Sequence, residues 1–235
     1  MPFLLLCAAA AASEDSIPSS PAAVFALKPT QAERFLREVE RNASSIVSLK
    51  GQFRQTRKSP LFIEDVVTTG QFYCKIPKRG PATFWCDMRV EGNGKGRPDI
   101  ECVNRVVDST SYLDLPETGQ HAEHSWDANE DRIAHLNHLL LGFLAKAEEV
   151  TRHYDVELLE PPDAAHSRLR LEPYLKETTD VKFLLLDFDN HTLYPTRVLV
   201  HGEEGNEAEI LITGVEKNVP IDENRMRPGR GRQGY

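Results

Sequence analysis

The sequence predicts an α+β protein built on a single strongly curved antiparallel sheet, an unclosed β-barrel whose concave side is covered by helices. Three observations lead to this fold class. A segment with helical spacing opens the folded part of the chain, and a second one interrupts a long series of strand-like runs. The runs follow one another across short turns, as expected of antiparallel neighbours. No internal repeat divides the series into separate units.

The length and composition fit one β-rich globular domain. The chain has 235 residues, of which 40% are hydrophobic and 27% are charged, as in ordinary soluble proteins. No stretch after the N-terminus has the roughly 18 consecutive apolar residues of a membrane-spanning helix. The formal net charge of −8 argues against a nucleic-acid partner, because phosphate binding needs clustered cations.

The N-terminal residues indicate export. Phe3 to Ala12 form a short apolar run that ends in small residues, so residues 1–12 are interpreted as a secretory signal peptide. The basic start of such a signal is missing, so either the true start lies upstream or the terminal amine supplies the charge. A buried N-terminal helix is the alternative. Residues 13–28, rich in Ser, Pro and Ala, are expected to be a flexible linker before a folded domain at residues 29–226.

The first element of this domain is an amphipathic helix. Thr30 and Glu33 have the spacing of a capping box at its start. Apolar residues then recur at helical spacing, namely Phe35, Leu36, Val39, Ala43, Ile46 and Val47. From Leu49 to Arg57 the period shortens to two, with Gly51 and Phe53 on the same face as Leu49, which predicts a half-buried strand.

Residues 66–74 and 83–88 are predicted to form a hairpin around a turn at residues 77–81. If that turn centres near Gly80, Cys74 lies opposite Cys86. A disulfide between these two residues is one interpretation for an exported chain. Two buried thiols under the barrel wall are the alternative, and Cys102 is another partner for either thiol.

The second half of the chain alternates in the same way. Residues 91–98 are predicted to be a loop and residues 100–115 a strand or loop. A second helix is expected from about Asn129 to Val150, with a stripe formed by Ile133, Leu136, Leu139, Leu140, Phe143 and Leu144. Strands are expected at 154–159, 168–171, 181–188, 193–200 and 208–215, and residues 227–235 are expected to be a disordered basic tail.

Motifs for chemistry are weak. His121, His124, His135 and His138 are the one cluster that could bind a metal, but their spacing matches no known zinc motif, and we expect a polar loop that enters a helix. No nucleophile motif is present. Asp155, Asp187 and Asp189 could form a carboxylate site, although aspartates at strand ends and turns are common. We therefore expect no enzyme, no metal and no cofactor.

Several segments together resemble the outer-membrane lipoprotein carrier family, LolA and its relatives. Leu49-Lys-Gly-Gln-Phe-Arg-Gln-Thr56 after the first helix resembles the family's "G-x-F-x-Q" strand, and Gly70-Gln-Phe-Tyr-Cys-Lys-Ile-Pro77 with Phe84-Trp85 resembles its "G-x-L-x-x-K-R-P…R-W" hairpin. Residues 183–186, 189–195, 198–206 and 210–218 resemble its closing strands. One residue departs from the pattern, since Ile76 occupies the position of the arginine that latches the family's lid.

The resemblance implies a function as well as a fold. It implies a monomeric periplasmic carrier that moves acylated lipoproteins or lipids from an inner-membrane ABC transporter to an outer-membrane acceptor. Such a carrier needs an apolar concavity, because each buried CH₂ contributes about 0.8 kcal/mol. The expected lining consists of Phe53, Phe72, Phe84, Trp85, Met88, Leu136, Leu140, Phe143 and Phe183. Ordinary core positions are the alternative for these residues, and an exported interaction module with a filled cavity is the alternative function.

Overall fold

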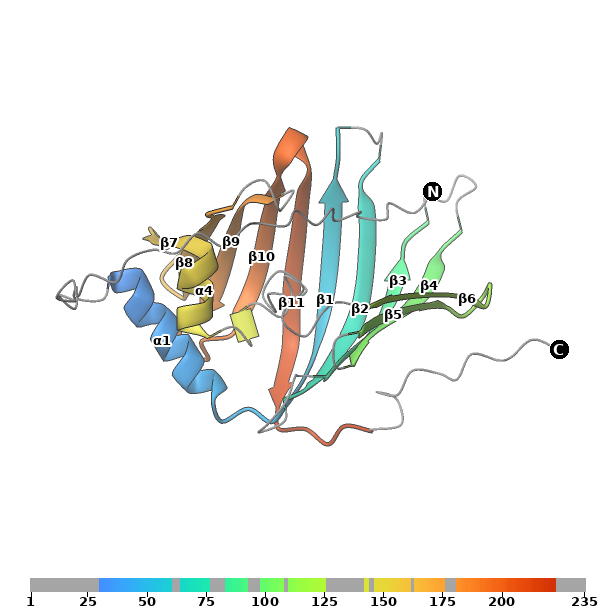
Figure 1. The fold of residues 1–235 in the computed structure, drawn as a ribbon, viewed down its shortest axis with the longest axis horizontal. Coiled ribbons are helices and arrows are strands. Elements are labelled where there is room, and N and C mark those ends of the chain that lie inside the picture. Colours follow the sequence, from blue (N-terminus) through green and yellow to red (C-terminus); the bar gives the residue numbers. More distant parts are fainter. Residues whose placement is uncertain are drawn as a thin grey trace, which may run out of the picture.

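The structure is a computed structural model, and it describes residues 30–60, 64–76, 83–92, 98–107, 110–125, 142–143, 146–161, 163–175 and 181–222. The predicted signal peptide, linker and basic tail lie outside these residues. The described part forms one curved sheet with helices on one side (Figure 1). No helix in these ranges has the length and hydropathy that a membrane crossing requires.

The sheet has 11 strands in the order β6-β5-β4-β3-β2-β1-β11-β10-β9-β8-β7, and every neighbouring pair is antiparallel. Because β6 and β7 are both edge strands, the sheet is not closed, which confirms the predicted fold class. The strands are β1 (Ser48–Lys58), β2 (Val66–Lys75), β3 (Thr83–Val90), β4 (Ile100–Val107), β5 (Thr110–Leu115), β6 (Gln120–Ser125), β7 (Tyr154–Leu159), β8 (His166–Pro173), β9 (Val181–Asp189), β10 (Pro195–Gly202) and β11 (Glu207–Lys217).

The first and last strands pair at the centre of the sheet. Phe53 of β1 lies opposite Ile212 of β11, and the register shifts between Lys50 and Gln52. Gly214 lies at this shift with a φ of 59°, a left-handed conformation that glycine adopts without a steric penalty. The pairing joins β1–β6 and β7–β11 into one sheet, although the two groups are separated along the sequence.

The helix α1 (Gln31–Ala43) begins as predicted, with reciprocal hydrogen bonds between Thr30 and Glu33. It ends four residues before the predicted Val47, because Ser44 caps it and the chain then enters β1. It lies over β7–β10 (Figure 1), and Ala32, Leu36 and Val39 are its buried residues. The ring of Phe35 meets that of Phe188 on β9 edge to face, with 5.4 Å between centroids, so α1 covers this end of the sheet.

The second predicted helix is wrong as one continuous element in its described part. Gly142 and Phe143 are helical, but Lys146 has an extended backbone (φ −79°, ψ 145°), and α4 (Ala147–His153) begins after it. The Ala147 N–H donates to Glu40 Oε2 of α1 at 3.3 Å. A free backbone N–H at the start of α4 is therefore satisfied by a tertiary contact in place of a local cap. Residues 129–141 of the prediction lie outside the described residues.

The sequence prediction also missed a strand. Residues 120–125 form the edge strand β6, which pairs with β5 from Thr110 to Leu115. Its described side chains are exposed and mostly polar, so they give no alternation of apolar and polar residues. Residues 100–115, predicted as one strand or loop, form two strands. The remaining predicted strands are present with bounds shifted by a few residues, as is usual for element ends.

Candidate functional site

The concave face of β1–β5 is the candidate site, and the strand register defines which residues belong to it. Gly51 lies opposite Phe72, Phe72 opposite Cys86, and Cys86 opposite Asn104. Residues directly opposite one another share a face of the sheet, and the face alternates along each strand. The concave apolar residues of these strands are Leu49, Phe53, Val66, Phe72, Cys74, Phe84, Cys86, Met88, Val90, Ile100, Cys102, Val106, Leu113 and Leu115.

Two glycines let aromatic rings lie flat on this face. A Cβ atom added to Gly51 would lie 2.5 Å from the Phe72 ring, and one added to Gly70 would lie 2.7 Å from the Phe53 ring. Each ring therefore occupies the space above the glycine on the neighbouring strand. The two glycine–phenylalanine pairs, Gly51 with Phe72 and Gly70 with Phe53, form an apolar surface at the centre of the sheet, and we call this surface, together with Phe84, the aromatic floor. The glycine and phenylalanine in the "G-x-F" segment of β1 are thus both explained by packing.

Phe143 contacts this floor from above. Its ring lies 6.1 Å from that of Phe72 on β2 and 5.9 Å from that of Tyr194, which precedes β10. The preceding Gly142 packs against Pro195, and a Cβ on it would lie 2.9 Å from that ring. The turn at residues 142–143 therefore holds an aromatic side chain over the middle of the concave face, as the lining prediction for Phe143 requires.

Burial decreases along the concave face from β2 toward β5. Phe72 is 0% exposed and Phe84 is 2% exposed, whereas Ile100 on β4 is 39% exposed and Leu113 on β5 is 38% exposed. Met88 is half-buried. Large aliphatic side chains that remain exposed on the inner face of a curved sheet form an accessible apolar surface. This surface is continuous with the buried aromatic floor of β1–β3.

Two predicted lining residues lie on the other face. Trp85 is adjacent to Phe84, so it points to the convex side, where it stacks on Tyr73 with 4.7 Å between centroids. Phe183 lies opposite His201 and stacks on it at 4.2 Å on the convex face, with the Arg170 guanidinium 5.0 Å from its ring. The prediction is wrong for these two residues. Leu136 and Leu140 lie outside the described residues.

The predicted register of the cysteines is also wrong. Cys74 lies opposite Phe84, and Cys86 lies opposite Phe72, so the two cysteines are diagonal rather than directly paired. Cys74, Cys86 and Cys102 are all buried free thiols. Burial raises the pKa of the Cys86 thiol, with smaller contributions from Asp87 and Cys102. The three side chains therefore act as small apolar parts of the concave face, which was the alternative interpretation.

Sequence reasoning missed a polar pair on the same face. Asn104 of β4 lies opposite Cys86, and Ser111 of β5 lies opposite Val106. The Ser111 hydroxyl donates to Asn104 Oδ1 at 3.2 Å. The signal was present in the sequence, because an asparagine among alternating apolar residues of a strand is unusual, but the faces of residues 100–115 had not been assigned.

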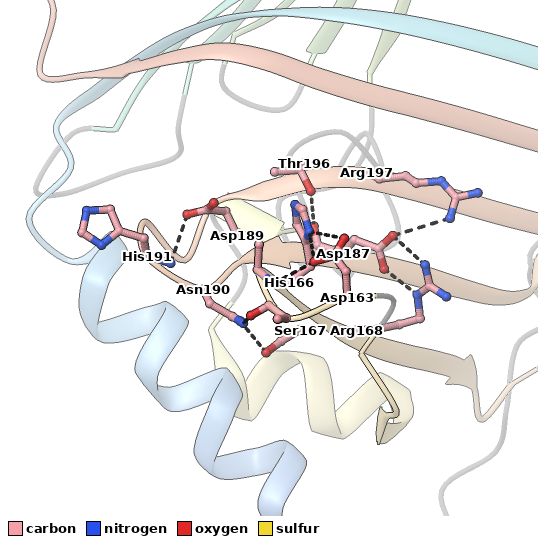
Figure 2. Close-up of polar contacts among 12 residues, drawn as sticks. Asp163, His166, Ser167, Arg168, Asp187, Asp189, Asn190, His191, Thr196 and Arg197 are labelled. Atoms are coloured by element: carbon pink, nitrogen blue, oxygen red, sulfur yellow. Dashed lines mark hydrogen bonds and ion pairs between the residues drawn. The ribbon is translucent and has the colours of Figure 1, made fainter.

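The convex face is charged, and on β8–β11 the charges form a chain of ion pairs. Arg168 donates two hydrogen bonds to Asp187, at 2.6 and 2.8 Å. Arg197 contacts Asp187 at 3.5 Å and Glu209 at 2.6 Å. Figure 2 shows Asp187 between the two guanidinium groups. The hydrogen bonds with Asp187 raise the pKa of Arg168, and the network links four strands.

Asp189 and Asp155, the two other aspartates considered for a carboxylate site, and the nearby Asp163 have structural roles or no side-chain partner among the described residues. Asp189 accepts hydrogen bonds from the backbone and hydroxyl of Thr192 in the turn after β9, and these bonds lower the pKa of its carboxyl. Asp163 is bonded to His166, which lowers its pKa (Figure 2). Asp155 is exposed on β7. Nothing in this arrangement pairs an acid with a base at an apolar site.

His121 is on the edge strand β6 rather than in a loop before a helix, and its Nδ1 lies 2.6 Å from Asp114 Oδ1. Within the described ranges, no three His, Cys, Asp or Glu side chains are arranged to hold a metal ion. His135 and His138 lie outside those ranges. Ile76, at the family's arginine position, extends the β1–β2 pairing through a backbone bond to Val47 and packs against the core.

A charged groove of about 410 Å³ lies between α1 and α4, lined by Glu33, Arg37, Glu40, Lys146, Ala147, Glu148 and Thr151. Two of these residues already stabilise helix starts, since Glu33 belongs to the capping box of α1 and Glu40 accepts the Ala147 N–H. The groove mixes both signs of charge and is unsuited to hydrocarbon.

The sequence matches no protein-family model and no curated protein, whereas 70 chains of solved structures match the fold. An uncharacterized conserved protein from Thermus thermophilus has a TM-score of 0.50 and 12% identity, over 86% of this chain and 97% of that one. The MucA/MucB complex of Pseudomonas aeruginosa has a TM-score of 0.47 and 14% identity, over 85% of this chain and 62% of that one.

A LolA superfamily protein from Nitrosomonas europaea has a TM-score of 0.42 and 11% identity, over 85% of this chain and 99% of that one. Likeness at these identities concerns the fold alone, and the two structures with TM-scores below 0.5 carry no argument. The chain spans 62% of the length of the chain it matches in the MucA/MucB complex.

Proposed function

We propose that the protein is a non-catalytic carrier that binds acyl chains on the concave face of β1–β5. The observation that carries this proposal is the apolar face itself. Its aromatic floor at Phe53, Phe72 and Phe84 continues into Ile100 and Leu113, each more than a third exposed. Each methylene group buried on such a surface contributes about 0.8 kcal/mol, so several are enough for reversible binding.

The proposed lining contains the five described residues that lie on the concave side, namely Phe53, Phe72, Phe84, Met88 and Phe143. Leu136 and Leu140 complete it in our proposal. Phe143 lies over the floor on a short helical turn and can act as part of a mobile cover. An acyl chain that displaces this ring from Phe72 would replace one apolar contact with another, which keeps the cost of opening low.

The remaining features of the proposal come from the family resemblance in the sequence. They are export to the periplasm, acylated lipoproteins or lipids as cargo, an inner-membrane ABC transporter as donor and an outer-membrane acceptor. Ile76 has no charge with which to latch a lid. We therefore propose that the cover is retained by apolar contacts such as that between Phe143 and Phe72.

The test uses two leucines with nearly equal exposure on opposite faces. Leu113 is 38% exposed on the concave face, and Leu211 is 40% exposed on the convex face. The mature protein is purified without detergent, and bound acyl species are measured by lipid extraction and native mass spectrometry. We expect Leu113→Glu to reduce acyl occupancy at least about tenfold, because a carboxylate would face hydrocarbon, and Leu211→Glu to leave it unchanged.

Loss of bound acyl species in the concave variant alone would support the carrier. The proposal is excluded if wild-type protein is empty and, while folded by circular dichroism, also fails to take up a triacylated peptide. Equal loss in both variants would indicate a general effect of charge rather than a binding face.

A second candidate is an interaction module on the same scaffold with a filled interior. Complete burial of Phe72 and near-complete burial of Phe143 favour this alternative. It predicts an empty wild-type protein whose stability is unaffected by acylated peptides, and a protein partner that contacts an outer surface.

A further inference from the structure

A hydrogen-bonded polar pair on β4 and β5 interrupts the apolar face on which the proposed function rests. Asn104 and Ser111 are both partly exposed there. Their neighbours on that face are Cys86, Cys102, Val106 and Leu113, and His124 of β6 lies opposite Ser111. An amide among apolar groups costs free energy unless its donors and acceptors are paired. The pair therefore needs an explanation beyond packing.

Ser111 fixes the orientation of the amide. Its hydroxyl donates to Asn104 Oδ1 at 3.2 Å, so the carbonyl of the side chain is already engaged. The Nδ2 group carries two N–H donors, and among the described residues it has no hydrogen-bond acceptor. The donors are thus available to a ligand on the concave face.

We propose that Asn104 Nδ2 binds a neutral acyl carbonyl, the ester or amide carbonyl through which an acyl chain is joined to its headgroup. This inference deepens the proposed carrier function and depends on it. The hydroxyl of Ser111 keeps the donor oriented, so Asn104 is the specificity-determining residue and Ser111 is a positioning residue.

The distribution of charge selects a neutral group. By register, the Asp, Glu and Arg side chains of β3–β6 belong to the convex face, namely Asp87, Arg89, Glu101, Arg105, Asp114 and Glu123; of the two histidines, His121 is convex and His124 lies opposite Ser111. A free carboxylate at Asn104 would lose hydration without gaining a lysine or arginine of β3–β6 as partner. An ester or amide carbonyl accepts the same hydrogen bond without that cost.

The position of Asn104 also sets the direction of the chain. From β4, the acyl tail can run across β3 and β2, about 10 Å at the usual strand spacing, toward the buried rings of Phe84 and Phe72. The headgroup then lies toward β5 and β6, where Gln120 is exposed on the same face. Polar and apolar parts of the ligand would each meet a matching part of the sheet.

The test measures, by equilibrium dialysis, how tightly the full chain binds four probes that each contain a sixteen-carbon chain. The probes are methyl palmitate, N-palmitoylglycinamide, palmitate and hexadecane. We expect the wild type to bind the ester and the amide about fivefold more tightly than hexadecane, the effect of one neutral hydrogen bond, and palmitate less tightly than the ester. Comparison of the ester and amide arms distinguishes a glycerolipid from an acylated peptide as the source of the carbonyl.

Asn104→Leu should lower ester and amide binding to the level of hexadecane without changing hexadecane binding. Gln52→Leu, which removes an exposed amide from the convex face of β1, should change nothing. Asn104→Asp keeps the shape and exchanges donors for acceptors, so it should lose the preference even if the leucine variant misfolds. Retention of the ester preference in a folded Asn104 variant overturns the inference.

Probe binding by the wild-type protein distinguishes failure of the carbonyl site from failure of the carrier function on which it depends. Equal binding of the ester and hexadecane overturns the carbonyl site and leaves the carrier intact. Binding of no probe at all overturns both.

Discussion

The two ends of the sheet use their concave faces in different ways. Over β7–β10, the concave leucines of β8 and β9 (Leu169, Leu171, Leu184 and Leu186) are almost fully buried beneath α1 and α4, and Phe35 and Phe188 join helix to sheet. Over β4–β5, Ile100 and Leu113 are more than a third exposed. One continuous sheet therefore carries a helix-covered core at one end and an accessible apolar surface at the other, which separates the residues that stabilise the fold from those available to a ligand.

The convex faces differ in the same sense. On β8–β11, Asp187 and Glu209 connect two arginines into one network across four strands. On β3–β6 the contacts form two smaller groups, with Arg89 bound to Asp99, and Arg105 bound to Asp114, which also contacts His121. We expect the helix-covered end to dominate the free energy of unfolding, and the following predictions test this in order of decreasing effect.

The largest expected difference is between two leucine truncations. Leu186→Ala on β9 removes a side chain that is 2% exposed and packed near Gly142, so it should lower the free energy of unfolding by about 3 kcal/mol. Leu113→Ala at the other end should cost less than about 1 kcal/mol. Urea titration of both variants checks this. Equal losses would mean that both ends contribute equally to stability.

The ion pairs should differ by less. Asp187→Asn leaves two arginines with a weaker acceptor, and because those arginine side chains are partly exposed, we expect a loss of about 1.5 kcal/mol in the free energy of unfolding. Asp114→Asn, which weakens the contacts of Asp114 with Arg105 and His121, should cost about 0.5 kcal/mol. Thermal unfolding at low and high salt measures both. A larger effect of Asp114→Asn would contradict the comparison.

The smallest expected effect is a pH dependence at the turn after β9. Hydrogen bonds from Thr192 lower the pKa of the Asp189 carboxyl below its usual range. A carboxyl with a lowered folded pKa stabilises the fold above its unfolded pKa, and this contribution is lost as pH falls through the folded pKa. Asp189→Asn should therefore flatten the stability profile below about pH 4.

Asp155→Asn is the matched control, since that carboxylate is exposed and has no ion-pair partner among the described residues. Unfolding by urea at several pH values measures the profiles. An unchanged acid dependence in Asp189→Asn would show that the turn does not contribute to it.

Much of the fold follows from the sequence, because most strands have one buried face. The capping box at Thr30 and the alternation after Leu49 identified α1 and β1, and the short turns identified the antiparallel order. The edge strand β6 was missed since its polar side chains face solvent on both sides. The start of α4 after the break is stabilised by Glu40, which lies 107 positions before Ala147 in the sequence. No local sequence pattern indicates such a distant contact.

The site was harder to predict, because a shift of one residue moves a side chain to the other face. Phe84 and Trp85 are consecutive, so only one of them can line the concave side. Phe183 begins the run Phe183 to Leu186, which is apolar on both faces and therefore gives no alternation. The predicted partner of Cys74 was displaced by two residues, from Phe84 to Cys86. The position of the turn was predicted only to within a few residues, and this does not fix the register of the hairpin.

The pairing of β1 with β11 has a kinetic consequence. Lys50 and Glu216, which bond across this pair, are 166 positions apart, so the centre of the sheet cannot form until nearly the whole described chain is available. Closing so long a loop costs conformational entropy before any contact is gained, and such topologies fold slowly. During this delay Phe53 and Phe72 lack the neighbouring strand that completes the sheet, and the newly made chain would need protection from aggregation.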